Sequence, residues 1–200
     1  MASHRAIAAA GAAIVSLLRD HYPRAEFGGG ALDVQLRQMP EIATAMADGI
    51  AVCLWRVTPN VQRRALGPRT DIHGRRFRPS LPIDLHYLLV PYGKDAERQQ
   101  RLLGWMLRAM DDLGPLVASQ LNHFLAESDI FADTETVDLV LDPLSIPDHL
   151  TLWDRVKVLP PAASYVMRML VLDSEKTLDE YPRVVERQFD MGVLGREVPA

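Results

Sequence analysis

The alternation of apolar and polar positions is clearest in the central stretch 81–92. Apolar side chains recur there at every second position, and from Leu88 onward both faces are apolar. Alternation with a period of two is typical of a β-strand, and a strand that is apolar on both faces needs a cover on both sides. The pattern therefore predicts a strand over residues 81–92, near the middle of a sheet.

Other segments repeat one of two patterns. Alternating segments predict strands over residues 32–36, 49–57, 137–141 and 164–173. Apolar residues at helical spacing predict helices over residues 3–22, 95–113, 116–125 and 145–159. This order of elements predicts an α/β (α+β) fold, in which helices pack on one mixed β-sheet of about four to six strands.

Each long helix has an apolar face that we expect to pack on the sheet. In the helix over 95–113 this face consists of Leu102, Leu103, Met106, Leu107 and Met110. In the helix over 145–159 we expect Leu150, Trp153 and Val156 to point inward. Ser3 and Ser145 stand where a side-chain oxygen can accept a hydrogen bond from the first turn, so we expect them to cap their helices.

Composition favours one domain over residues 1–174, followed by a charged tail over residues 175–200. The chain has 200 residues, of which 48% are hydrophobic, enough for a sizeable core. No apolar run reaches the roughly 18 residues of a membrane helix, so no membrane role is expected. Cys53 is the only cysteine and lies in an apolar run, which predicts a buried, inert thiol.

The segment 58–80 lacks apolar periodicity and is rich in arginine. Seven arginines and one acid lie between Arg56 and Arg78, whereas fifteen acids and seven basic residues follow from Glu127 onward. Such separated charge suits head-to-tail association with copies or neighbours. We expect a solvated loop that orders against a protein partner. The expected contact residues are Arg63, Arg64, Arg69, Arg75, Arg76 and Arg78.

No signature of catalysis, of a cofactor site or of a metal site emerges. The six histidines show no short ligand spacing. Asp84, His86 and Ser164 would be the candidates for a hydrolase, but the sequence has no nucleophile elbow. We therefore expect Asp84 and His86 to make hydrogen bonds between strands or to face a partner.

A nucleic-acid-binding role for the loop 56–78 is the main alternative from another class of function. Against it, Phe77 is the only aromatic residue among these arginines, no nucleic-acid-binding motif accompanies them, and the whole chain carries a net charge of −4. Binding to protein surfaces is the favoured interpretation.

Four dispersed motifs resemble one known family. The strand motif is carried by Pro82, Asp84, Leu85, Tyr87 and Leu88, and the helix motif by Leu103, Gly104, Met106 and Leu107. Two further motifs are carried by Leu144, Ser145, Leu152 and Trp153, and by Ser164, Tyr165, Arg168, Asp173 and Ser174. Together they are similar to the N-terminal domain family of tail-terminator or cap proteins of contractile injection systems, which are phage-tail-like particles related to antifeeding prophages.

The resemblance implies a non-enzymatic assembly protein without a cofactor. Members are expected to form a homo-oligomeric ring, usually a hexamer, that ends the polymerisation of the inner tube and the sheath at the distal end of the particle. It also implies assembly in the cytoplasm, followed by residence in the finished particle. Tube protein, sheath protein and copies of the chain itself are the partners that the resemblance implies.

Overall fold

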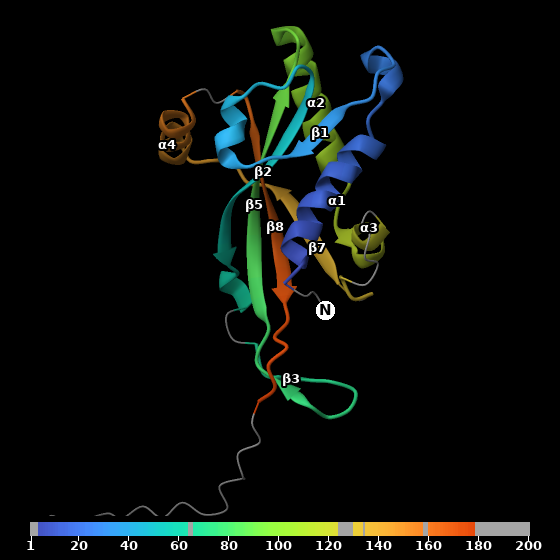
Figure 1. Cartoon of the computed structure of the whole chain (residues 1–200), viewed down its shortest axis with the longest axis vertical. Coiled ribbons are helices and arrows are strands. Elements are labelled where there is room, and N and C mark those ends of the chain that lie inside the picture. Colours follow the sequence, from blue (N-terminus) through green and yellow to red (C-terminus); the bar gives the residue numbers. More distant parts are fainter. Residues whose placement is uncertain (1–3, 64–65, 124–129, 134, 158–159, 179–200) are drawn as a thin grey trace, which may run out of the picture.

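The fold is built around one six-stranded mixed sheet (Figure 1). The computed structural model describes residues 4–63, 66–123, 130–133, 135–157 and 160–178. Strand order across the sheet is β1-β2-β5-β8-β7-β6, and β3 pairs with β4 apart from it. The strands are β1 (Asp33–Leu36), β2 (Gly49–Pro59), β3 (Arg69–Thr70), β4 (Arg76–Phe77), β5 (Leu81–Tyr92), β6 (Leu116–Val117), β7 (Thr136–Leu141) and β8 (Ala163–Leu172). The helices are α1 (Ala6–Asp20), α2 (Ala96–Asp112), α3 (Ala118–His123) and α4 (Ile146–Val156), with short 3-10 helices η1 (Arg24–Phe27), η2 (Met39–Ala43) and η3 (Val61–Arg63).

Strand β5 occupies the central position that its apolar pattern predicted. It pairs antiparallel with β2 on one side and with β8 on the other. Only β1 runs parallel to its neighbour β2, which makes the sheet mixed as expected. The predicted fold class is therefore confirmed.

Helices α1, α2 and α3 cover one face of the sheet. Ile14 of α1 and Met106 of α2 are fully buried against Leu85 and Leu89 of β5 in the larger apolar cluster. Of the stripe predicted for α2, Leu102, Met106 and Met110 are buried, whereas Leu103 and Leu107 are only partly covered. None of the helices in the described ranges is both long enough and apolar enough to cross a bilayer.

Among the residues that the structure describes, the opposite face is covered only at one end, by η2 and α4. A smaller apolar cluster lies there and includes Ile42, Cys53 and Tyr92. The Tyr92 hydroxyl donates a hydrogen bond to the Ile42 carbonyl at 2.6 Å, which ties η2 to β5. Cys53 is fully buried, and burial raises the pKa of its thiol to about 11. The predicted burial of Cys53 is confirmed, and the raised pKa favours the protonated, less reactive thiol.

The orientation predicted for α4 was wrong at two of its three positions. Leu152 and Val156 pack on the smaller cluster, but Leu150 is 61% and Trp153 is 52% exposed. The helix carries two apolar stripes, and helical spacing cannot tell which of them meets the sheet. Its predicted start is confirmed, because Ser145 Oγ accepts a hydrogen bond from the Asp148 N–H at 3.2 Å.

Two other helix boundaries differ from the prediction. Helix α1 begins at Ala6 with Arg5 at its N-cap, and the expected cap, Ser3, lies outside the described residues. The segment that begins at Leu116 starts as the short strand β6, because Leu116 and Val117 pair with β7 before α3 begins.

Gly49 permits the close approach of β1 and β2. A methyl group there would collide with the carbonyl oxygen of Asp33 and come within 2.7 Å of Met46 Cε. We expect Gly49→Ala to lower the free energy of unfolding by about 1–3 kcal/mol, since the backbone of β1 must shift. Urea denaturation measures the loss. Gly104→Ala is the matched control, because nothing lies within 4 Å of the added carbon, and equal losses would contradict the argument.

Residues 69–78 are more ordered than the sequence predicted. Strands β3 and β4 form a hairpin, and Phe77 of β4 also pairs with Thr177. Two main-chain hydrogen bonds extend this pairing, from Arg78 N to the Lys176 carbonyl and from Leu178 N to the Arg76 carbonyl. The prediction of a solvated loop was wrong for this part, which is a hairpin, and the hairpin projects beyond the end of the sheet (Figure 1). We call residues 69–78 the arginine arm.

Candidate interaction surfaces

The base of the arginine arm is held by contacts within the chain. The Arg69 guanidinium lies 4.4 Å from the centre of the Phe77 ring, and its Nε lies 3.5 Å from Asp173 Oδ2. Arg75 approaches the same ring at 5.7 Å. A guanidinium over an aromatic ring and a carboxylate beside a guanidinium are attractive contacts. These side-chain contacts stabilise the short hairpin. The arm is thus a structured projection rather than a bare loop.

The tip of the arm is a turn organised by Asp71. Its Oδ1 accepts hydrogen bonds from the N–H groups of His73 and Arg75, each at 2.9 Å, and its Oδ2 pairs with Arg75 Nε at 2.7 Å. Desolvation acts in the opposite direction, but these bonds hold the pKa of Asp71 below its usual value. Gly74 has φ of +79°, a left-handed conformation that suits glycine. Ile72, at the tip, is 96% exposed.

The structure brings four of the six arginines chosen as contact residues onto this arm. Arg69 and Arg75 are engaged with Asp173 and Asp71, whereas the side chains of Arg76 and Arg78 are exposed to solvent. The main chain of Arg63 lies apart from the arm, in η3, and Arg64 lies outside the described residues. Arg76 and Arg78 are therefore the members of the set best placed to meet a partner.

The predicted interstrand hydrogen bonds of Asp84 and His86 are confirmed. His86 lies between Thr58 Oγ1, 3.1 Å from Nε2, and Asp142 Oδ2, 3.2 Å from Nδ1. Asp84 Oδ1 accepts hydrogen bonds from Asn60 Nδ2 at 2.9 Å and from the Met169 N–H at 3.0 Å. These side chains join β2, β5, β8 and the end of β7 across the part of the sheet that α4 leaves uncovered.

Asp84 has a local structural task in β8. Met169 has φ of +67°, and the register between β5 and β8 shifts between Ile83 and Leu85. A displaced main-chain N–H needs a new acceptor when the ladder is interrupted, and the Asp84 carboxylate supplies it. This explains why an aspartate stands in the central strand.

The hydrolase arrangement considered from the sequence does not form a hydrogen-bonded chain. Ser164 is buried opposite Leu88, and its Oγ makes no hydrogen bond within the described residues. The partners of His86 are Thr58 and Asp142 rather than Ser164 and Asp84. The geometry therefore supports a structural role for these polar groups.

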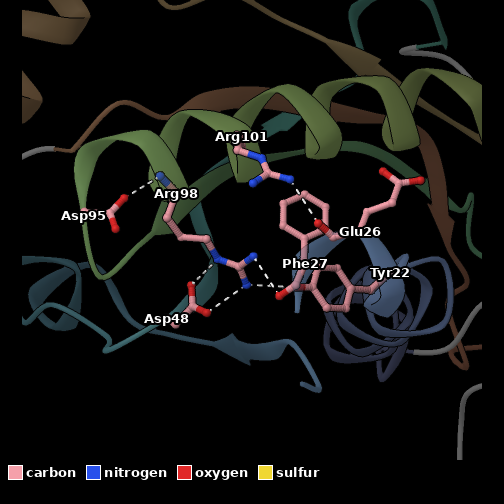
Figure 2. Close-up of polar contacts among 7 residues, drawn as sticks. All are labelled: Tyr22, Glu26, Phe27, Asp48, Asp95, Arg98 and Arg101. Atoms are coloured by element: carbon pink, nitrogen blue, oxygen red, sulfur yellow. Dashed lines mark hydrogen bonds and ion pairs between the residues drawn. The ribbon is translucent and has the colours of Figure 1, made fainter. Parts of the chain in front are cut away.

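A second polar cluster joins α2 to the loops at the far end of the sheet (Figure 2). Arg98 forms a two-point contact with Asp48, with Nε 3.0 Å from Oδ1 and Nη2 2.8 Å from Oδ2. It also donates hydrogen bonds to the Tyr22 hydroxyl at 2.8 Å and to the Phe27 carbonyl at 3.3 Å. The hydrogen bond to Asp48 is the main cause that raises the pKa of Arg98. No sequence signal identified this cluster.

We expect Arg98→Ala to destabilise the fold by about 1.5–3 kcal/mol. The substitution removes hydrogen bonds made by a charged group that is mostly shielded from solvent. Arg101→Ala, on the same helix, is the control, because exposed Arg101 donates one bond, to the Glu26 carbonyl at 3.0 Å (Figure 2). Arg101→Ala should lower the free energy of unfolding by less than about 1 kcal/mol. Equilibrium unfolding in urea compares the two, and similar losses would show that the Asp48 contact contributes little.

An apolar groove of about 690 Å³ lies between the second half of α2 and the strands β7 and β8. Its apolar lining includes Leu107, Met110, Leu139, Leu141 and Tyr165. Its charged lining comes from Arg108, Asp111 and Asp138. Leu141 is 49% exposed, so the groove opens to solvent at the edge of the sheet.

The comparison with known families agrees with the fold and the motifs. The family model described as the Pvc16 N-terminal domain matches residues 9–186. The chain belongs to this family. The match includes the four motifs and the arginine arm, so the resemblance that the sequence suggested is confirmed. No curated protein matches the sequence.

Two solved structures share the fold of this Pvc16 N-terminal domain protein. One is the sheath/tube terminator of PVC, an extracellular contractile injection system, in its extended state, with a TM-score of 0.58, 14% identity and 93% of this chain covered. The other is the tube-terminating cap of the anti-feeding prophage, with a TM-score of 0.56, 14% identity and 88% covered. This chain spans 65% and 58% of those chains, less than two thirds of either.

Proposed function

We propose that this protein is a structural cap, or tail terminator, of a contractile injection system. It forms a ring, hexameric in our proposal, that ends the polymerisation of tube and sheath at the distal end of the particle. The observation that carries the proposal is the family match over residues 9–186. The shared fold with a sheath/tube terminator and with a tube-terminating cap supports it.

The surfaces of the domain suit a protein that meets several neighbours. A ring subunit binds its copies sideways and the last tube or sheath layer below, so it needs separate contact faces. The arginine arm, the apolar groove and the exposed stripe of Ile146, Leu150 and Trp153 on α4 lie on different elements. Arg63, Arg64, Arg69, Arg75, Arg76 and Arg78 remain the proposed partner-binding residues, and Arg76 and Arg78 make the direct contacts in this proposal.

The proposed role is non-enzymatic and requires no cofactor. The two solved structures described above are named as terminating parts of particles, and the polar groups around His86 bond to one another between strands. In this proposal the protein joins the particle in the cytoplasm and remains in the released particle. Residues 1–174 act as the cap domain, and residues 175–200 act as a charged C-terminal tail, which is distinct from the arginine arm.

Deletion and add-back of the chain test the cap function. We expect particles assembled without it to have tubes and sheaths of variable length with open ends, and particles assembled with it to have a defined length. Electron microscopy measures the lengths and the ends, and native mass spectrometry of the purified chain, alone and with tube and sheath proteins, measures its association. Particles of normal length without the chain, or a monomer that joins no particle, would contradict the proposal.

A further inference from the structure

We propose that the tip of the arginine arm of one subunit inserts into the groove between α2 and β7 of the adjacent subunit. The proposal rests on the cap function above and specifies how neighbouring subunits meet. A head-to-tail contact uses two different surfaces of the same chain, and repetition of such a contact closes a ring. The arm and the groove are two such surfaces.

The tip of the arm presents an exposed apolar side chain on an ordered turn. Its apolar side chain, Ile72, is 96% exposed, although the turn around it is fixed by Asp71 and Arg75. Because the ordered turn holds this aliphatic side chain in water, only contact with another molecule can bury it. Because the turn is already ordered, docking costs little conformational entropy.

The groove offers the matching apolar site. Leu107 and Met110 of α2 and Leu139 and Leu141 of β7 line it, and its volume of about 690 Å³ has room for a branched aliphatic side chain together with part of the main chain of a turn. Gly104 also lines it, and nothing lies within 4 Å of the position that its missing Cβ would occupy. The absence of a side chain at Gly104 therefore leaves that part of the groove open.

The edge of the sheet beside the groove adds main-chain hydrogen-bonding capacity. In the described part of the chain, β6 pairs with Thr136 and Val137 of β7 and with no residue beyond them. The outer side of β7 from Asp138 to Leu141 is the adjoining sheet edge. Main-chain groups at such an edge can exchange hydrogen bonds with the main chain of an inserted turn while its side chain enters the groove.

Charge on the two surfaces is complementary. Asp111, 74% exposed, and Asp138 line the groove, and exposed Arg76 and Arg78 accompany Ile72 on the arm. Arg108, the basic residue of the groove, pairs with Asp111 and Asp112 of its own helix, so these three side chains together keep a net negative charge, to which Asp138 adds. Opposite charges around an apolar contact orient two subunits and disfavour other pairings. These observations favour a second copy of this chain as the occupant of the groove.

Disulfide trapping tests the contact in the assembled particle. The native Cys53 is fully buried, so introduced surface cysteines are the reactive ones. Chains with Ile72→Cys and chains with Leu141→Cys are co-expressed with the other particle proteins, and capped particles are purified and mildly oxidised. We expect a covalent dimer that contains one chain of each kind. Ile72→Cys with Leu150→Cys is the control, because Leu150, a leucine on α4, is 61% exposed against 49% for Leu141 and does not line the groove, so it should give no dimer.

Two further variants test the contact without cross-linking. Ile72→Ser removes the inserted side chain, and Gly104→Leu fills the groove. Leucine favours a helix more than glycine does, so the second variant should remain folded. We expect each to weaken self-association at least about tenfold in sedimentation experiments, as loss of a central interface residue does.

The outcomes separate this contact from the cap function. Capped particles that yield no Ile72→Cys to Leu141→Cys dimer, or that yield equal amounts with Leu150→Cys, overturn the contact and leave the cap function standing. If Gly104→Leu self-associates as strongly as the unchanged protein, the contact is likewise overturned and the cap function stands. A chain that is found in no particle overturns both.

Discussion

Reversal of charge at Arg76 and Arg78 is expected to give over-long or uncapped particles. Both side chains are exposed on the arginine arm, where opposite charge would repel the acidic surfaces that we propose they meet. The substitutions Arg76→Glu and Arg78→Glu should leave the monomer folded, because the main-chain bonds of these residues to Leu178 and Lys176 do not depend on the side chain. Electron microscopy of particles that contain the double variant measures the effect.

The same charge change at the other end of β5 is the control for this experiment. Arg24 and Lys94 are exposed and lie beyond the end of β5 that is distant from the arm. Arg24→Glu with Lys94→Glu changes the net charge equally and should leave particle length normal. Normally capped particles from the arm variant would contradict the proposed role of the arm, and defects in both variants would show that net charge matters rather than position.

Truncation of Leu85 is expected to cause the largest loss of stability. Leu85 is fully buried in the central strand, beneath the helices of the larger apolar cluster. Leu85→Ala removes apolar contacts and leaves a cavity that the surrounding elements can fill only in part, so the free energy of unfolding should fall by about 2–5 kcal/mol. Urea denaturation followed by fluorescence measures this loss.

Leu81 provides a matched comparison on the same strand. It begins β5 and is 54% exposed, so Leu81→Ala removes the same atoms from a site already half in water. The loss should be below about 1 kcal/mol. Losses of similar size at the two positions would show that β5 is not the centre of the core.

The sequence predicted the elements whose burial is visible in their own apolar pattern. β5 shows alternation and then two apolar faces because helices lie on one side of its whole length and on the other side only at its end. The buried stripe of α2 and the cap Ser145 are likewise local features. Local rules act over a few residues, so one sequence is enough to read them.

Helix α4 shows the limit of that approach. Its apolar residues form two stripes, and either could have met the sheet. Contact with η2 and with the smaller cluster partly buries Leu152 and Val156, which leaves Leu150 and Trp153 outside. Only the position of the neighbouring elements decides between the two stripes.

The arginine arm, the Arg98 cluster and the groove depend on residues that are distant in sequence. Phe77 pairs with Thr177, Arg98 meets Asp48 and Tyr22, and the groove combines α2 with β7 and β8. Each of these contacts joins segments that only the tertiary fold brings together, and no local periodicity encodes it. The sequence by itself determined the order of the main helices and strands along the chain, the apolar pattern of the core and the family of this protein. The tertiary structure decided which surfaces are free to meet partners, because exposure depends on what packs beside a residue rather than on its own spacing along the chain.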